Sequence, residues 1–371
     1  GNQLMDSSGR PPFRADHVGS LLRPPPLRQA FRDHHGKKID DARFAEIQDR
    51  CIRDVVAMQQ DAGLKVVTDG EFRRGSYWGR FVERVDGFVI RQAAFNFRDD
   101  HGHEVAFTAP YAERTLKRTQ PLALDEFTFL RAETKATPKI TIPAPSTMHF
   151  YRCNDFADQA AYPDAESFFA DLTAIFRAEI AGLIEAGCRY IQMDEVAVAL
   201  LCDPSIRQKV EAAGQHPDRL VDLYIKAIND AVAGAPKDVV FGVHMCRGNF
   251  KGHYLAAGGY ESVAERFFSE TRVNHFLLEY DTERAGNFAP LRFVKNKGVV
   301  LGLISSKLPA LEGLDALKRR TGEATKFIDL DRLAISPQCG FASTVAGNPV
   351  TEADERAKLK LVVDAARAIW G

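Results

Sequence analysis

The feature that most constrains the fold is a regular alternation of short β-rich runs with longer stretches of helical periodicity. Eight such runs follow one another, at residues 15–18, 65–68, 139–142, 190–193, 239–243, 275–278, 299–303 and 333–335. The stretches at 40–62 and 165–186 between them carry apolar side chains at helical i+3 and i+4 spacing. Neighbouring parallel strands need a crossover, which is normally a helix, so the alternation predicts a parallel sheet.

Eight such units predict an α/β fold of the closed (β/α)8, TIM-barrel type. The alternative, an open doubly wound sheet, lacks its glycine-rich phosphate-binding turn, because the first run is followed by VGSLLRPPP. Residues 75–138 are too long for a simple connection, so we expect an inserted hairpin or lid there. The whole of 1–371 is expected to be one domain, with residues 1–13 a disordered or expression-derived leader.

Composition and charge exclude several classes of partner. The chain has 49 Lys and Arg against 50 Asp and Glu, so neither nucleic acid nor a membrane surface is expected as a partner. The opening residues lack the apolar core of a secretory signal, and no stretch approaches the roughly 18 apolar residues of a membrane span. We expect a cytoplasmic protein with small-molecule partners. Self-association into a homo-oligomer is left open.

The sharpest local signal is the sequence VHMC at residues 243–246, where the fifth predicted strand ends. Alternation along an extended strand places the side chains of His244 and Cys246 on one face, toward the barrel mouth. A His-X-Cys pair alone is weak evidence, because such pairs also arise by chance. The six cysteines show no tight paired spacing, so we expect thiols, some of them metal ligands.

Two further residues favour a metal site. Glu279 ends the sixth predicted strand and Cys339 follows the eighth, so both emerge at the barrel face where active sites are assembled. With His244 and Cys246 they form an imidazole, thiolate and carboxylate set that suits tetrahedral Zn²⁺. On spacing alone, the alternative is a buried thiol at Cys339 and a salt-bridged rim carboxylate at Glu279.

Several segments of the chain together resemble the catalytic half of cobalamin-independent methionine synthase, and more closely the short single-barrel members of that superfamily. They are ADHVGSLLRP, VVTDGEFRRGSYW, YIQMDEVA, FGVHMCRGNF, LLEYDTERAG and ISPQCGFAS. The resemblance runs from about residue 14 to 370, and it implies a zinc-binding (β/α)8 barrel with the ligands His244, Cys246, Glu279 and Cys339. Such a thiolate-rich, anionic shell favours holding a substrate thiolate over activating water.

The resemblance also implies a binding site for the amino-acid part of homocysteine. Its backbone N–H donors for the carboxylate and its acids for the ammonium correspond to Val18, Gly19, Ser20, Glu71 and Asp194. A zwitterion needs donors at one end and anions at the other. From the residues alone, Gly19 is a turn glycine and Asp194 a helix N-cap. Glu195 is the less favoured of the two adjacent acids.

The donor side departs from the family pattern. Ile304 stands where the full-length synthases place a His that protonates the departing folate, and isoleucine cannot transfer a proton. Either the leaving group needs no acid, or another residue supplies the proton; the candidates are His17, His149, Ser305 and Lys307. The Trp expected to stack on the pterin is replaced by Tyr151.

The leading interpretation is a zinc-dependent S-methyltransferase of the 5-methyltetrahydropteroyltriglutamate–homocysteine methyltransferase kind. It would methylate homocysteine or a related small thiol, with methyltetrahydrofolate or another compound as the methyl donor. One alternative is an enzyme of the same superfamily that opens an epoxide with a small thiol, similar to the coenzyme M transferase branch. Another is a non-catalytic zinc-binding barrel. A zinc hydrolase is disfavoured, because the predicted metal shell is too rich in thiolates.

Overall fold

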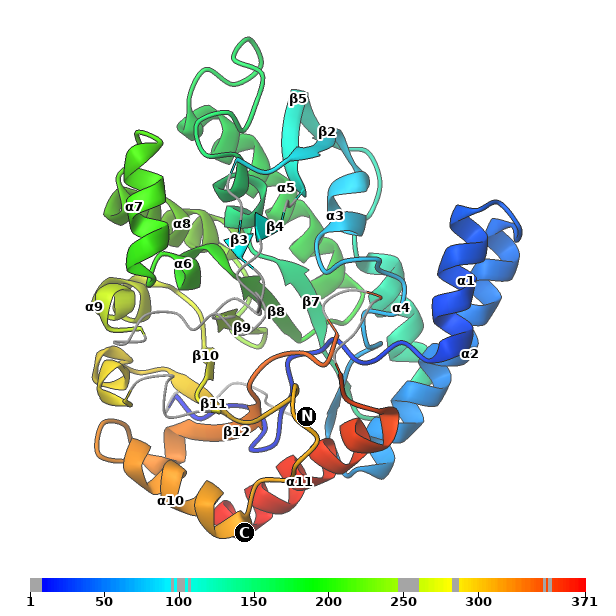
Figure 1. The fold of residues 1–371 in the computed structure, drawn as a ribbon, viewed down its shortest axis with the longest axis vertical. Coiled ribbons are helices and arrows are strands. Elements are labelled where there is room, and N and C mark those ends of the chain that lie inside the picture. Colours follow the sequence, from blue (N-terminus) through cyan, green and yellow to red (C-terminus); the bar gives the residue numbers. More distant parts are fainter. Residues whose placement is uncertain are drawn as a thin grey trace.

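The computed structural model describes residues 9–94, 97–98, 104–105, 108–245, 260–281, 287–342, 345 and 349–371, and for 97–98, 104–105 and 262 the backbone alone. Its main sheet is parallel, in the order β7 to β12 (Figure 1). These strands are β7 (Ile140–Pro143), β8 (Tyr190–Glu195), β9 (Val240–Met245), β10 (His275–Glu279), β11 (Gly298–Ile304) and β12 (Leu333–Pro337). The predicted α/β fold with a parallel sheet is confirmed.

Two shorter segments extend this sheet at its ends. β1 (Val66–Val67) pairs in parallel with β6 (Thr137–Pro138), which leads directly into β7, and Ala15 forms a parallel bridge with Ile335 on β12. The described residues contain no ladder pair between Ala15 and β1. Two hydrogen bonds link the turns that follow these segments: Leu21 N–H donates to the Gly70 carbonyl at 3.0 Å, and Thr68 Oγ1 donates to the Gly19 carbonyl at 2.6 Å. Eight parallel segments thus follow one another in the order of a TIM-type barrel.

Helices fill the connections between the strands. They are α1 (Pro25–His35), α2 (Asp41–Asp61), α3 (Gly79–Glu83), α4 (Leu124–Glu133), α5 (Ala165–Glu185), α6 (Ala197–Leu200), α7 (Pro204–Ala212), α8 (Pro217–Val232), α9 (Glu261–Glu270), α10 (Leu314–Ala324) and α11 (Glu352–Trp370). Short 3-10 turns are η1 (Pro145–Met148), η2 (Phe150–Arg152), η4 (Ala289–Phe293) and η5 (Leu330–Arg332). Within the described ranges, no helix is both long and apolar enough to cross a membrane.

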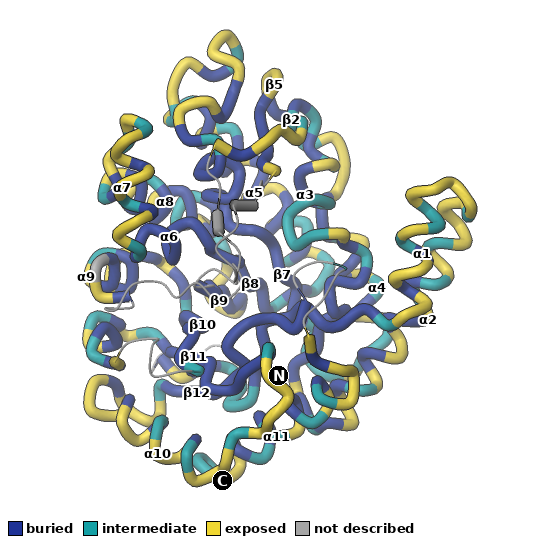
Figure 2. The backbone as a smooth tube through the Cα atoms, viewed as in Figure 1, coloured by how far each residue is buried: buried dark blue, intermediate teal, exposed yellow. Residues whose placement is uncertain are grey.

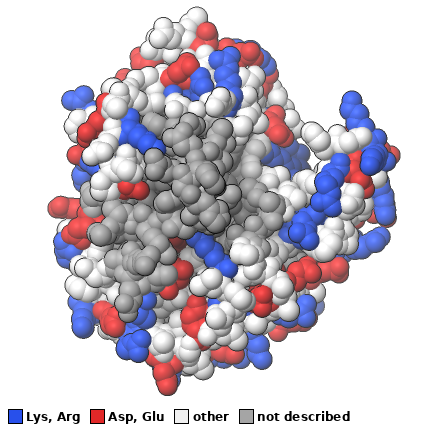
Figure 3. All heavy atoms as spheres, viewed as in Figure 1, with Lys and Arg blue, Asp and Glu red and all other residues white. Residues whose placement is uncertain are grey.

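The two long helices predicted from periodicity begin at side-chain caps. The Asp40 carboxylate accepts from Arg43 N–H at the start of α2, and Asp164 accepts from Ser167 N–H at the start of α5. The strands of the main sheet, β7 to β12, are dark blue in Figure 2 because helices and loops cover them, whereas the α1–α2 pair projects with mostly exposed residues. Positive and negative side chains are interspersed around the face drawn in Figure 3.

The predicted insertion is present between β1 and β6. β2 (Val85–Gln92) pairs antiparallel with β5 (Thr108–Arg118), and β3 (Phe97–Arg98) pairs antiparallel with β4 (Glu104–Val105). The hairpin of β2 and β5 lies at the top of the molecule in Figure 1, beside α3. The expectation of an inserted hairpin in residues 75–138 is therefore confirmed.

Part of the expected leader belongs to the fold. The Phe13 ring stacks on Tyr190 of β8 with centroids 6.2 Å apart, and Arg10 forms an ion pair with Asp331 at 2.8 Å. Residues 9–13 are thus packed against the barrel, contrary to the expectation for 1–13, because an aromatic side chain there fits over the end of the sheet. Residues 1–8 lie outside the described residues.

Candidate active site

Three neighbouring strands each carry a polar side chain into the barrel interior near their carboxyl ends. Asp194 on β8 lies opposite His244 on β9, and His244 lies opposite Leu277 on β10, two residues before Glu279. Because side chains alternate along a strand, Glu279 shares the face of Leu277. All three polar side chains are buried. The carboxyl end of the sheet therefore collects an imidazole and two carboxylates, as predicted for a barrel site.

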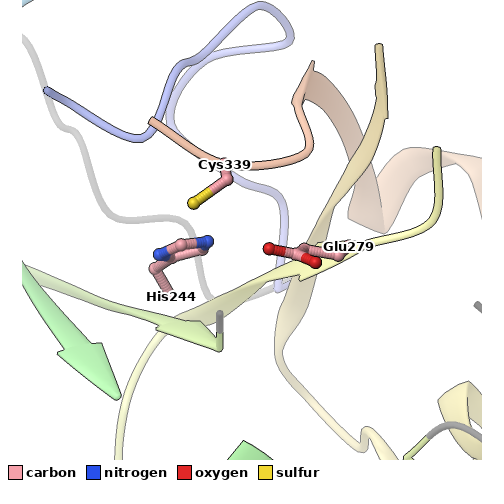
Figure 4. A group of neighbouring side chains, drawn as sticks. All are labelled: His244, Glu279 and Cys339. Atoms are coloured by element: carbon pink, nitrogen blue, oxygen red, sulfur yellow. The ribbon is translucent and has the colours of Figure 1, made fainter. Parts of the chain in front are cut away.

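His244, Glu279 and Cys339 form a compact group of ligand atoms. One ligand atom from each lies within 4.8 Å of the others, and Figure 4 shows the three side chains pointing toward a common centre. His244 Nδ1 lies 3.4 Å from Asp194 Oδ1, and its Nε2 is buried with no hydrogen-bond partner among the described residues. The fourth expected ligand, Cys246, follows β9 directly and lies outside the described residues.

A tyrosine hydroxyl ties together the strand ends that carry two of these ligands. Glu279 N–H donates to Tyr260 Oη at 2.9 Å, and that hydroxyl donates to the Met245 carbonyl at 3.4 Å. Tyr260 precedes α9 and is completely buried. It fixes the end of β9 relative to the end of β10, and thereby the spacing of His244 and Glu279.

Two glycines allow the Cys339 turn to reach this group. A Cβ on Gly302 of β11 would lie 2.7 Å from Gln338 Cα, and a Cβ on Gly340 would lie 1.8 Å from Ser20 Oγ. A larger residue at position 340 would first displace the Ser20 hydroxyl, and one at position 302 would push the backbone of the turn away. Backbone bonds then hold it: Gln338 N–H donates to the Ile304 carbonyl at 2.8 Å, and Phe341 N–H donates to the Ser20 carbonyl at 3.0 Å.

The turn formed by Val18, Gly19 and Ser20 presents unused donors. Gly19 has φ +129°, and a Cβ there would lie 2.8 Å from Thr141 Cγ2, so both conformation and space require glycine. The described residues provide no hydrogen-bond acceptor for the three backbone N–H groups of the turn. Buried N–H groups normally have a partner, so this turn is suited to receive an anion such as a carboxylate.

The two acids expected to hold an ammonium group are neighbours in the structure. Burial raises the pKa of Glu71 to about 8; the Arg74 guanidinium opposes this shift, and the nearby Asp194 carboxylate adds to it. Arg74 Nη1 lies 3.5 Å from Glu71 Oε1 and Nη2 lies 2.7 Å from Glu126 Oε1. A cation bound beside Glu71 would favour the ionised form of this acid.

The adjacent acid, Glu195, points to the other side of β8. Its carboxylate accepts from Ser146 Oγ at 2.5 Å and from Val198 N–H at 2.9 Å, at the start of α6. Burial raises the pKa of Glu195 to about 7. The side chain that accepts a hydrogen bond at the start of α6 is therefore Glu195 and not Asp194. The alternative that Asp194 is a helix N-cap is wrong.

The proposed proton donors are not gathered at one place. His149 is buried in an aromatic cluster, with its Nδ1 2.9 Å from Tyr224 Oη and its ring centroid 4.6 Å from that of Phe156. Burial lowers the pKa of His149 to about 3, so the ring is neutral near pH 7. Burial likewise lowers the pKa of His17 to about 4, beside Lys139. Both positions argue against donation from these two rings.

Ser305 and Lys307 lie just past the carboxyl end of β11. Ser305 is buried and its Oγ accepts from the backbone N–H groups of Lys307 and Leu308, both at 3.1 Å, while Lys307 is half-buried. Ile304 is completely buried. Tyr151 is buried beside the base of the insertion, since its carbonyl accepts from Ala94 N–H at 2.7 Å.

Sequence reasoning missed the buried polar side chains beneath the site. Gln192 and Lys139 are both buried in the barrel interior, and Gln192 donates to Asp194. The signal for Gln192 was its position two residues before Asp194, which alternation places on the same face. Lys139 carried no comparable signal, because a lysine at a strand start normally indicates an exposed position.

Comparison with known proteins gives a consistent picture. Residues 15–368 match the family model of the cobalamin-independent synthase catalytic domain. An uncharacterized Bacillus subtilis protein, YxjH, is 40% identical over 373 residues, covering 99% of this chain and 97% of the relative. A methionine synthase of Pyrococcus abyssi is 28% identical over 326 residues, covering 87% of this chain and 85% of that protein.

Solved structures share the fold. A putative vitamin-B12 independent methionine synthase of Listeria monocytogenes superposes with a TM-score of 0.77 at 32% identity, covering 97% of this chain and 98% of the other. A B12-independent methionine synthase of Shewanella sp. W3-18-1, in complex with selenomethionine, superposes with a TM-score of 0.75 at 21% identity, covering 96% of this chain and 97% of the other. The second likeness concerns the fold alone.

Proposed function

Because this chain belongs to the family of cobalamin-independent synthase catalytic domains, we propose that it transfers a methyl group to the sulfur of homocysteine or a related amino-acid thiol. The product would be methionine or the corresponding thioether. One observation carries the proposal: Asp194 Oδ1, part of the expected ammonium site, lies 3.4 Å from Nδ1 of His244, an expected metal ligand. An amino-acid thiol needs its ammonium and its sulfur held on adjoining sides of one site.

The donor set fits zinc. We propose His244, Cys246, Glu279 and Cys339 as ligands, supported by the buried Nε2 of His244 and by the approach of three of the four side chains within 4.8 Å. When bound, zinc would supply positive charge that lowers the pKa of a substrate thiol below its usual value of about 8.5, leaving a nucleophilic thiolate near pH 7.

The remaining residues would bind and orient the acceptor. The free N–H groups of Val18, Gly19 and Ser20 would receive the carboxylate, and Glu71 and Asp194 would receive the ammonium. Burial of both acids excludes water and strengthens their attraction for a cation.

The methyl donor would approach from the side of β11 and the insertion. Ser305 and Lys307 follow β11 and are the candidates that could reach a departing group, whereas Tyr151 would provide an aromatic face. We propose methyltetrahydrofolate or a more activated methyl compound as the donor. The buried acids favour an amino-acid thiol over the simple thiols of an epoxide-opening enzyme.

The test uses zinc-loaded protein and homocysteine, with each methyl donor in a separate reaction. The donors are mono- and polyglutamyl methyltetrahydrofolate, methylcobalamin and a methyl sulfonium. Methionine, detected by mass spectrometry, should form with at least one of them and not without protein. Failure with every donor, in protein that retains zinc, would overturn the proposed transfer.

A further inference from the structure

A chain of buried polar side chains runs through the barrel interior beneath the proposed acceptor site. Lys139 Nζ donates to Asp16 Oδ1 at 2.9 Å and to Gln192 Oε1 at 2.8 Å. Asp16 Oδ2 accepts from Tyr190 Oη at 2.6 Å, and that hydroxyl lies 2.8 Å from His275 Nε2. The whole set is at most 1% exposed. Buried polar groups are costly unless paired, so this arrangement holds one geometry.

The upper end of the chain is a single amide with two acceptors. Gln192 Nε2 donates to the Val18 carbonyl at 2.7 Å and to Asp194 Oδ1 at 2.9 Å. An amide nitrogen carries two protons, so both are used. Val18 begins the turn proposed for the substrate carboxylate, and Asp194 belongs to the pair proposed for the ammonium. One side chain therefore contacts both ends of the proposed amino-acid site.

Lys139 determines which way this amide faces. An ammonium group only donates, so it requires the oxygen of Gln192, and the nitrogen must then face Val18 and Asp194. The reversed amide would set its N–H groups against the ammonium and its oxygen against the Asp194 carboxylate. The third partner of Lys139 is the His17 carbonyl, so its donors are all satisfied in this orientation.

We infer that Gln192, held by Lys139, is a positioning residue that fixes the spacing between the Val18–Ser20 turn and Asp194 and so restricts the acceptor to thiols carrying an α-amino acid. The inference rests on the proposed function and names its specificity determinant. In the described structure the side-chain hydrogen bonds of Gln192 go to Val18, Asp194 and Lys139 and to none of the proposed metal ligands, so it acts through the groups it holds.

The test compares two thiols by calorimetry on the full zinc-loaded chain. Gln192→Glu keeps the shape and the acceptor for Lys139 but removes both donors and places an oxygen against the Val18 carbonyl. Losing a hydrogen bond to a charged group typically weakens binding roughly tenfold to a hundredfold, so homocysteine affinity should fall by that factor. The affinity for 2-mercaptoethanol, which lacks both charged ends, should change less than about twofold.

A matched control and a second variant complete the design. Gln48→Glu alters another buried glutamine, whose amide donates to the Phe72 carbonyl and to neither Val18 nor Asp194 in the described structure, and it should leave both affinities unchanged. If Gln192→Glu does not fold, Gln192→Asn, one methylene shorter, should reach only one acceptor and give the same selective loss. In protein that already carries Asp194→Asn, the change Gln192→Glu should reduce homocysteine affinity by a smaller factor than it does in the native protein. The reason is that part of the effect of Gln192 passes through Asp194.

The two hypotheses fail in different ways. Native protein that binds homocysteine no better than 2-mercaptoethanol contradicts the proposed function itself. Native protein with a strong homocysteine preference that survives intact in both Gln192 variants overturns the positioning role alone. A parallel loss for both thiols with normal zinc content would show that Gln192 supports the site as a whole and does not set its specificity.

Discussion

His244 presents its Nδ1 to the Asp194 carboxylate, 3.4 Å away, and leaves Nε2 for the ligand group with Glu279 and Cys339. A carboxylate on the far nitrogen fixes the orientation of a metal-binding imidazole and increases its basicity. The same Asp194 is proposed to receive the substrate ammonium. Two functions thus converge on one carboxylate, and they are separable by experiment.

The first prediction concerns metal content. The purified chain should contain about one zinc ion, because four candidate ligands complete one tetrahedral shell. Cys339→Ser should lose most of that zinc, measured by mass spectrometry of the metal after dialysis. Cys51→Ser is the control, since Cys51 is buried in α2, far from β12 in the sequence, and should retain it. Full zinc in the Cys339 variant would remove this residue from the ligand set.

The second prediction concerns the ammonium group. Asp194→Asn should weaken homocysteine binding by at least about tenfold, since a buried charge would lose its partner. A thiol without an amino group, such as 3-mercaptopropionate, should be affected far less. Zinc content must be measured in the same sample, because Asp194 also contacts His244. Equal losses for the two thiols would contradict the assigned role.

The third prediction uses the contact between Ser20 and Gly340. Gly340→Ala would place a methyl group 1.8 Å from Ser20 Oγ and 3.1 Å from Ser20 Cβ. Rotation of the hydroxyl relieves only the first of these contacts, so the Cys339 turn should shift and zinc affinity should fall. The double variant Ser20→Gly with Gly340→Ala removes the clashing hydroxyl and should recover zinc. Competition with a chelator measures both. A Gly340→Ala protein with native zinc affinity would show that the turn is not held by this contact.

The fourth prediction is a pH dependence of stability. Burial raises the pKa of Glu355 on α11 to about 8, while its carboxylate accepts from Leu22 N–H at 2.8 Å. Because the folded pKa exceeds the unfolded one, this group favours folding at low pH and that contribution is lost as pH rises from about 4.5 to about 8. At pH 9 the free energy of unfolding of Glu355→Gln, measured by urea titration, should therefore exceed that of the native protein by roughly 1–3 kcal/mol. At pH 5 the difference should be smaller. The reverse order at pH 9 would contradict it.

The fifth prediction concerns the methyl donor. Ile304 cannot donate a proton, and general acid help is typically worth about 10²–10⁴ in rate, so turnover with methyltetrahydrofolate should be slow and fall as pH rises. A methyl sulfonium carries its own activation and should react faster with less dependence on pH. Rates of about 1–10³ per second with methyltetrahydrofolate would mean that another group, such as Lys307, already supplies the proton.

The strands were predictable because strongly periodic helices bound them on both sides. The run predicted at 190–193 is observed as β8 (Tyr190–Glu195). In the run predicted at 15–18, only Ala15 pairs with a neighbouring strand, through its bridge to Ile335. There the carbonyls of His17 and Val18 accept from side chains, Lys139 and Gln192, in place of a neighbouring strand. Such replacements depend on partners distant in sequence, which periodicity does not reveal.

The candidate site was likewise predictable at the strand ends and not in the connections. Residues at strand ends could be assigned to the barrel mouth, and His244, Glu279 and Cys339 do lie together. His149 sits in a 3-10 connection, where no alternation indicates the side chain's direction, and aromatic residues from α5 surround it. The pairing of Lys139 with Gln192 was invisible because burial of a charge depends on the assembled fold.

The direct packing of Ser20 against Gly340 joins two turns that are translated at different times. The turn proposed for the substrate carboxylate is translated long before the cysteine turn that rests on it. No nascent fragment that lacks β12 can hold both. On the proposed ligand set, the complete zinc site would form only after translation has passed Cys339, and a fragment that ends before β12 should bind zinc and homocysteine more weakly than the whole chain.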